Sequence, residues 1–194
     1  MNDAINLRLS FIKVCKGEYN MTRRDRTEFI ITGALIAAAY AGLTYLSNVF
    51  GLAYGPIQLR VSEVLTILPV FTPAAIPGLT VGCFIANIGS FNVADMFFGT
   101  FATLAAAWLT YFLRNVKFKD IPLLSMFPPV IVNAVIIGFE IACFYLAEGY
   151  SFWGFIISAF EVGLGQFIVC YFFGVPFYLV VKKYGIFEKK IFKK

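Results

Sequence analysis

Long apolar stretches separated by three basic clusters constrain this chain more than any other feature. Fifteen of its 16 lysines and arginines lie between Arg8 and Arg26, between Arg114 and Lys119, or between Lys182 and Lys194, and the exception is Arg60. Basic residues that flank membrane-crossing segments collect on the cytoplasmic side. The clusters therefore predict which ends of the apolar stretches face the cytoplasm, and they leave Arg60 on the opposite side.

The composition is that of a membrane protein. Hydrophobic residues make up 60% of the chain and charged residues 14%, whereas soluble domains average about 45–50% and about 25%. We expect one multi-pass domain in the cell (plasma) membrane at residues 28–181, between a cytoplasmic extension at 1–27 and a basic cytoplasmic tail at 182–194. Met21, followed by TRRDR, resembles a natural start, so residues 1–20 are assigned no function.

Four stretches are long enough to cross the hydrocarbon core of a bilayer, which needs about 20 apolar residues. They are Phe29–Leu46, Val93–Leu113, Leu123–Leu146 and Phe152–Val181.

The intervening region Val61–Ile88 is apolar but contains three prolines. If the basic clusters on either side of it are both cytoplasmic, an even number of crossings separates them. This parity favours two short segments, broken near Phe71–Pro73, over one kinked span, because discontinuous helices are tolerated at membrane depth. We therefore expect an all-α membrane protein of six transmembrane helices, with both termini cytoplasmic and the second and third spans short and interrupted by proline.

Several classes of function are disfavoured. The chain has no histidine, no CxxC pair among its four cysteines and no GxxxxGK[ST] loop, so we expect no bound metal, no cofactor and no enzymatic activity. The net charge of +5 comes from basic residues that flank apolar spans, as inner-leaflet anchors do. It therefore indicates contact with the lipid bilayer and not with nucleic acid.

Ionisable groups within membrane spans are costly and usually mark a pathway or a site. In the six-span arrangement they fall in the outer half of the membrane, together with two asparagines, and we expect them to form a polar pocket at the outer surface. The residues are Glu63, Asp95, Glu140, Glu161, Asn87 and Asn133. For Glu63 and Asp95 the alternative is an interfacial residue that reaches water.

The outer loop before the second span adds Gln58 and Arg60 to these candidates. Arg60 and Glu63 are three residues apart, so on a helix they can form an ion pair, and that pair is the alternative to a ligand contact. Trp153 lies near the outer end of the last span, where it either stacks on a flat ligand or anchors the chain at the interface.

The first span carries small residues at four-residue spacing, which places them on one helix face and allows another helix to approach closely. One strip is Gly33, Ala37 and Ala41, and a second, one step round the helix, is Ala34, Ala38 and Gly42. Either strip can serve for packing within this bundle or for docking to a partner subunit.

The segment GPIQLRVSEVLTILPVFTPAAIPGLTVGCFIANIGS, Gly55–Ser90, and the stretch beginning DMFFGTFATLAAAWLTYFLRN at Asp95 resemble the QueT family of substrate-binding (S) components of energy-coupling factor (ECF) transporters. The resemblance covers most of residues 28–181. It implies uptake of a queuosine precursor, a deazaguanine base, and docking through an AxxxA pattern to a transmembrane coupling (T) subunit driven by two cytoplasmic ATPases. That pattern occurs at Ala34 and Ala38, or at Ala37 and Ala41.

With such a ligand, charge and placement suggest a role for each candidate. Glu140 or Glu161 accepts hydrogen bonds from the ring N–H and the exocyclic amine, and a second carboxylate holds an aminomethyl cation. Asn133 or Asn87 contacts the remaining edge of the base, and Arg60 or Gln58 donates to its carbonyl. The alternatives are a different vitamin or purine-like substrate, a self-sufficient secondary transporter or channel, and, least favoured, a membrane enzyme.

Overall fold

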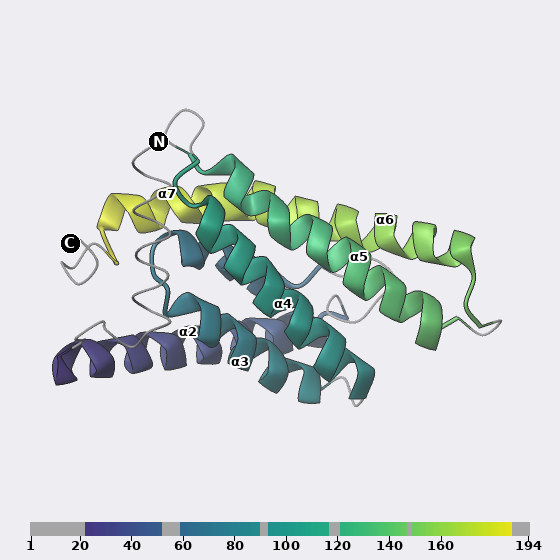
Figure 1. The fold of residues 1–194 in the computed structure, drawn as a ribbon, viewed down its shortest axis with the longest axis horizontal. Helices are drawn as coiled ribbons and strands as arrows, with labels where there is room; N and C mark the ends of the chain where they lie inside the picture. The colour runs from purple at the N-terminus through teal and green to yellow at the C-terminus, as the bar shows by residue number, and fades with distance from the viewer. Residues whose placement is uncertain (1–21, 52–58, 90–92, 117–120, 147–148, 188–194) are drawn as a thin grey trace. The chain divides into compact units, whose positions relative to one another are not determined.

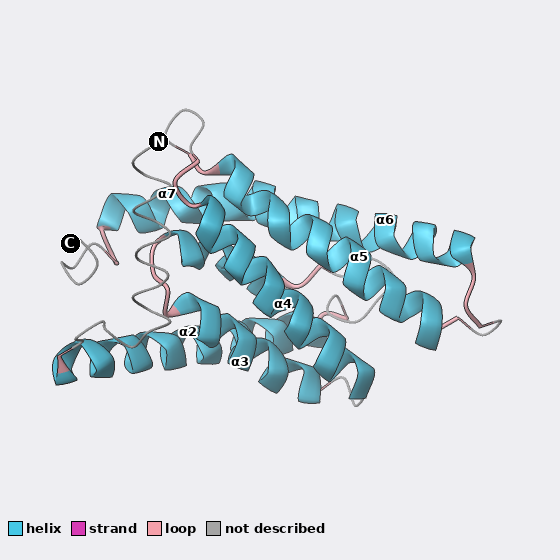
Figure 2. Cartoon of the chain, in the orientation of Figure 1, coloured by secondary structure: helices cyan, strands magenta, loops and turns pink. Residues whose placement is uncertain are grey.

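The computed structural model describes residues 22–51, 59–89, 93–116, 121–146 and 149–187. These residues form helices and connecting loops and contain no strand (Figure 2). In chain order the elements are α2 (Arg23–Val49), η1 (Val61–Val70), α3 (Ala75–Ile88), α4 (Val93–Leu113), η2 (Leu123–Met126), α5 (Phe127–Phe144), α6 (Phe152–Phe167), η3 (Ile168–Phe173) and α7 (Gly174–Tyr184) (Figure 1). Contacts divide the chain into two units, residues 1–31 and residues 32–194.

The first unit contains the start of α2, which is fixed by reciprocal capping. Thr22 Oγ1 accepts a hydrogen bond from the backbone N–H of Asp25, and Asp25 Oδ2 accepts one from the backbone N–H of Thr22. This exchange satisfies donors that the first helical turn leaves without partners. Arg24 in this first turn and Glu28 in the next form an exposed ion pair at 3.0 Å.

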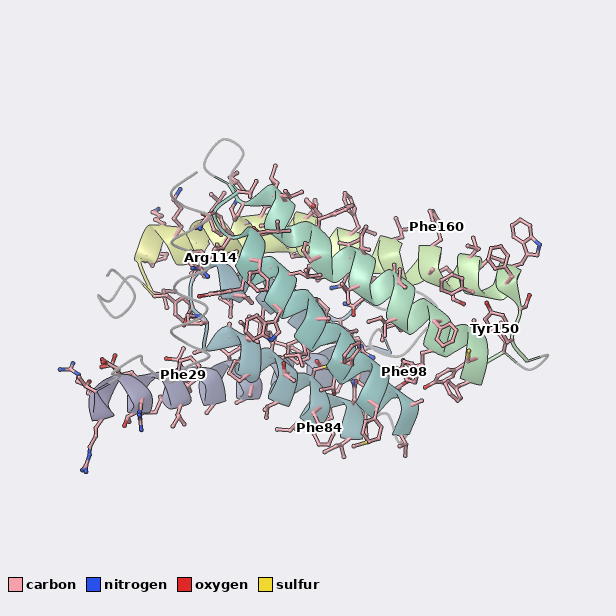
Figure 3. The ribbon with its side chains drawn as sticks, viewed as in Figure 1. Phe29, Phe84, Phe98, Arg114, Tyr150 and Phe160 are labelled. Carbon is pink, nitrogen blue, oxygen red and sulfur yellow. The ribbon has the colours of Figure 1, made fainter. Side chains whose placement is uncertain are left out.

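The prediction of an all-α protein with four long apolar spans is confirmed. The helices long and apolar enough to cross a membrane are Arg23–Val49, Val93–Leu113, Leu123–Phe144 and Phe152–Tyr184. Large apolar side chains project from them: Phe160 is 70% exposed and, like Phe84 on α3, points away from the neighbouring helices (Figure 3). An outer surface of this kind suits contact with lipid tails.

The proline-rich region forms two shorter apolar helices, as predicted, with the break at residues 71–74. Pro73 cannot donate a backbone hydrogen bond and disfavours helix at the residue before it, so the chain turns there. Pro77 is accommodated because it lies in the first turn of α3, where backbone N–H groups have no helical partner. The first piece, η1, is a 3₁₀ helix of ten residues, unusually long for this helix type.

The last span is one continuous helical run with a change of winding inside it. Residues Ile168–Phe173 form a π-helical segment, η3, between α6 and α7. Ser151 caps the start of α6 by accepting a hydrogen bond from the backbone N–H of Gly154. The run ends at Gly185, which adopts the left-handed conformation with a φ of 59° that glycine accepts without strain.

Helix α2 packs against α3 through small residues of both helices. A side chain added at Gly78 would meet the backbone oxygen of Gly33 at 2.7 Å, and one added at Gly82 would meet that of Ala37 at 2.8 Å. The first small-residue strip, Gly33–Ala37–Ala41, is therefore buried within this bundle. The second strip, Ala34–Ala38–Gly42, is exposed, and no atom lies within 4 Å of a side chain built at Gly42.

Candidate functional site

Three polar residues of α2 hold the start of η1 in place. Tyr40, Thr44 and Ser47 follow one face of the helix, and each is buried. The Tyr40 hydroxyl donates to Glu63 Oε1, Thr44 Oγ1 donates to Ser62 Oγ at 2.7 Å, and Ser47 Oγ accepts from the backbone N–H of Val61 at 3.0 Å. This ladder fixes the position of Arg60 and Glu63 inside the bundle.

Glu63 is buried, with 4% of its surface exposed. Its second carboxylate oxygen, Oε2, accepts a hydrogen bond of 2.9 Å from Gln166 Nε2 on α6. Glu63 therefore joins three elements, α2, η1 and α6, through its two oxygens. A buried carboxylate needs such donors, because leaving it without partners costs several kcal/mol.

Arg60 is buried as well and donates from Nη1 to Asn87 Oδ1 at 3.2 Å. Asn87 in turn donates from Nδ2 to the backbone oxygen of Asp95 at 2.9 Å. An ion pair between Arg60 and Glu63, the alternative raised by their spacing, is not found in the described part of the chain. The contacts instead extend from Arg60 through Asn87 to the start of α4.

A small cavity lies among these groups. It is lined by residues from η1, α4, α5 and α6: Arg60, Glu63, Gly99, Thr103, Asn133, Ile137, Val162 and Gln166. Thr103 is the middle residue of α4, so the cavity lies near mid-helix. Its volume of about 20 Å³ accommodates roughly one water molecule.

Asn133 differs from the other polar residues of the lining. It is 6% exposed and makes no hydrogen bond to any described residue, whereas Arg60, Glu63 and Gln166 all do. Its amide carries both donors and an acceptor. Asn133 is therefore available to bind a molecule in the cavity without first losing a partner.

Glu140 and Asp95 lie beyond the cavity on α5 and α4. Glu140 is 1% exposed, and its Oε1 has no hydrogen-bond partner in the described structure. It lies within electrostatic range of Asp95 and Arg60. Asp95 is half-buried and accepts a 2.5 Å hydrogen bond from the Tyr145 hydroxyl at Oδ1.

The remaining sequence candidates lie elsewhere. Glu161 is half-buried on α6 and does not line the cavity. Trp153 is 72% exposed and packs against the ring of Phe152, with 6.2 Å between centroids. Gln58 lies outside the described residues.

Sequence reasoning missed Gln166, Thr103 and Tyr40, although each contacts the cavity or a residue that lines it. Their side chains are uncharged, so a search for ionisable groups in apolar spans did not single them out. Gln166 could have been recognised as a candidate site residue because it is an isolated amide within an apolar helix.

The described residues contain no group of three or more histidine, cysteine or acidic side chains arranged to hold a metal ion. The polar lining instead combines one cation, one carboxylate, two amides and one hydroxyl. Such a mixture of donors and acceptors can bind a neutral, polar heterocycle by hydrogen bonds at several edges.

Residues 30–183 match the family model described as QueT transporter. The queuosine precursor transporter QueT of Lactococcus lactis subsp. cremoris (strain MG1363) is 39% identical over 98 residues, which are 50% of this chain and 57% of that protein. The similarity thus spans little more than half the length of this curated relative. No solved structure matches the chain.

Proposed function

This chain belongs to the QueT transporter family of multi-pass membrane proteins, and from that membership we propose that it is the substrate-binding component of an ECF importer for a queuosine precursor. The proposed ligand is a deazaguanine base, a flat bicycle with N–H donors on one edge and a carbonyl acceptor. The relative named as a queuosine precursor transporter supports this choice.

The observation that carries the proposal is the polar cavity within an apolar helix bundle. Arg60, Glu63 and Gln166 are all at least nine-tenths buried there. Polar and ionisable groups buried within membrane spans are costly, and they usually mark a functional site. In our proposal Glu63 accepts from the N–H edge of the base, Arg60 donates to the carbonyl, and Asn133 contacts the remaining edge.

The size of the cavity has a consequence for binding. A bicyclic base needs far more room than about 20 Å³. We therefore propose that the side chains around the cavity separate when the base enters, and that the hydrogen bonds of Glu63 to Tyr40 and Gln166 are exchanged in part for bonds to the ligand.

We further propose that the ends of α4 and α7 near Arg114 and Lys182 face the cytoplasm, as basic residues do, with both termini on that side and six crossings in all. Arg114 lies at the end of α4 in Figure 3. The start of α4 and the end of α5 then face outward, toward the source of substrate.

The exposed strip Ala34–Ala38–Gly42 supports docking to a transmembrane coupling subunit, itself driven by two cytoplasmic ATPases. Small residues on an exposed helix face permit close helix contact in a membrane. Because the neighbouring strip is already packed against α3, the exposed strip is the one we propose for the partner.

Calorimetric titration of the purified full chain with deazaguanine precursors tests the proposal. We expect binding without any ATPase subunit, and weaker or no binding of adenine and of unrelated vitamins. Tight binding of one of those compounds instead would support the other-substrate alternative. Substrate uptake into liposomes that contain this chain alone would support a self-sufficient transporter and contradict the proposal.

A further inference from the structure

The cavity lies at the boundary between two groups of helices. Half of its lining residues come from α4 and from η1 with its N-cap residue, and the other half come from α5 and α6. They are Arg60, Glu63, Gly99 and Thr103 on one side and Asn133, Ile137, Val162 and Gln166 on the other. A separation of the two groups would therefore widen the cavity directly.

Helices α5 and α6 form a closely packed antiparallel hairpin (Figure 1). Three glycines mark close approaches along its length, because a side chain added at any of them would meet an atom of the opposite helix or the residues next to it. These approaches are 3.2 Å from Gly163 to Ala134 Cβ, 2.7 Å from Gly138 to Ala159 Cα and 2.3 Å from Gly154 to Leu146 Cδ1. Such tightly packed surfaces transmit movement and do not deform readily, so the hairpin can move as one body.

The elements α2, η1, α3 and α4 form the second group. The polar ladder from α2 holds the start of η1, and Arg60 donates to Asn87 of α3. Asn87 in turn donates to the backbone oxygen of Asp95 in α4, and a side chain added at Gly99 of α4 would lie 2.5 Å from Asn87 Nδ2. These contacts hold one wall of the cavity in place.

Both helices of the hairpin change winding where they join the rest of the chain. The 3₁₀ segment η2 precedes α5, and the π-helical segment η3 follows α6. Because α5 and α6 are antiparallel, the two segments lie at the same end of the hairpin, where the Tyr171 hydroxyl on η3 donates to the backbone oxygen of Leu123 on η2 at 3.0 Å. Changes of winding of this kind occur where helices bend and often mark functional hinges.

We propose that the α5–α6 hairpin swings as a unit about a hinge at η2 and η3 to admit the base, an inference that rests on the proposed function. The swing moves one wall of the cavity away from the other and breaks the hydrogen bond from Gln166 to Glu63. The apolar faces of α4 and α5 that separate then meet lipid tails, which are as apolar as the side chains they replace. The membrane therefore opposes this opening less than water would.

The swing is largest at the end of the hairpin far from the hinge. Ile137 lies ten residues beyond the start of α5 and Phe144 lies 17 residues beyond it, which is roughly 15 and 25 Å along the helix. The far end therefore moves farther than the cavity wall at Ile137. There the Tyr145 hydroxyl donates to Asp95 Oδ1 at 2.5 Å, and this hydrogen bond between the two groups breaks when they separate.

Distances between spin labels test the swing directly. The labels are coupled to a keto amino acid introduced at exposed positions of the full chain, so the native cysteines are kept. One pair, at Val93 and Phe152, spans the two groups at the far end. The control pairs are Phe144 with Phe160 inside the hairpin and Val49 with Val93 inside the other group. The probe ligand is 7-cyano-7-deazaguanine, and calorimetry first establishes whether each labelled chain binds it.

We expect saturating base to lengthen the distance between Val93 and Phe152 by more than about 2 Å, as in hinge rearrangements, and to change both control distances by less than about 1 Å. An unchanged or shorter distance in a chain that binds the base rejects the swing and leaves the proposed function standing. Equal changes in all three pairs reject movement of the hairpin as one body. If the unlabelled chain does not bind the base, the proposed function fails, and the swing with it.

Tyr145→Phe provides an independent test. The variant lacks the hydrogen bond that holds the far ends together, so the base no longer has to break it on entry. We expect a lower unfolding temperature and yet binding that is about two- to tenfold tighter. Tyr45→Phe is the control, because its lost bond to the backbone oxygen of Ile85 lies inside one group, and its affinity should not change. Unchanged or weaker binding by folded Y145F rejects the swing.

Discussion

The hydroxyl of Tyr40 on α2 donates a hydrogen bond to the carboxylate of Glu63 on η1. Tyr40 is fully buried, and Glu63 lines the polar cavity. The helix that presents the exposed small-residue strip is therefore bonded directly to the candidate binding site.

Tyr40→Phe removes this bond with little change of shape. We expect it to lower the free energy of unfolding by about 1–3 kcal/mol, because Glu63 loses a buried donor, and to weaken binding of a deazaguanine. Thermal unfolding and calorimetry measure the two effects. Tyr45→Phe is the control, since the Tyr45 hydroxyl bonds the backbone oxygen of Ile85 at a more exposed place. An equal loss in both variants would contradict a special role for the Tyr40–Glu63 contact.

Close packing of α2 on α3 predicts opposite effects for two glycine-to-alanine changes. Gly78→Ala places a methyl group 2.7 Å from the backbone oxygen of Gly33, so the helices must separate, at a cost of about 1–3 kcal/mol. Gly42→Ala meets no atom within 4 Å and should leave stability unchanged or raise it by up to about 1 kcal/mol. Thermal unfolding in detergent distinguishes them, and equal effects would argue against this packing.

If the exposed strip is the docking surface, a change in it should prevent assembly with the coupling subunit without affecting ligand binding. Ala38→Phe should leave the affinity of the purified chain for its ligand unchanged, because Ala38 faces away from the cavity, and should abolish co-purification with the coupling subunit. Val135→Phe, on an exposed part of α5, is the control and should assemble normally. Normal assembly of the Ala38 variant would remove the strip from the proposed interface.

The contact between Arg60 and Asn87 can be tested with a double-mutant cycle. Because Arg60 Nη1 bonds Asn87 Oδ1 at 3.2 Å, the stability losses of Arg60→Ala and Asn87→Ala should be non-additive by about 0.5–3 kcal/mol. Arg60→Ala should also weaken ligand binding, since Arg60 lines the cavity. A loss of stability with unchanged affinity would give Arg60 a purely structural role.

The helices were largely predictable because their signals are local. Val93–Leu113 is apolar throughout and was predicted with its observed bounds, and Pro73 marks the break between η1 and α3 through its missing donor. Which small-residue strip packs inside was not predictable, because both strips have the same spacing. Only the position of α3, with Gly78 facing Gly33, distinguishes them.

The site was only partly predictable for a related reason. Charge pointed to Glu63 and Glu140 within the apolar spans and to Arg60 in the loop before them, and all three are buried in the structure. Charge did not indicate which buried groups form hydrogen bonds with one another, because Gln166, which donates to Glu63, lies 103 residues away in the chain. That pairing depends on how α6 packs against η1 and the other helices, and no local pattern encodes it.

The most direct test of the account is calorimetric titration of Asn133→Leu with a deazaguanine precursor. Asn133 lines the cavity and makes no hydrogen bond to any described residue, so the change should remove the proposed ligand contact without breaking a hydrogen bond among the described residues. For Asn133→Leu we predict an unfolding temperature close to that of the wild-type chain and ligand binding weaker by about tenfold or more. Asn48→Leu, at an exposed position, is the control and should bind the ligand with unchanged affinity. Wild-type affinity in the folded Asn133 variant would contradict the assignment of this cavity as the binding site.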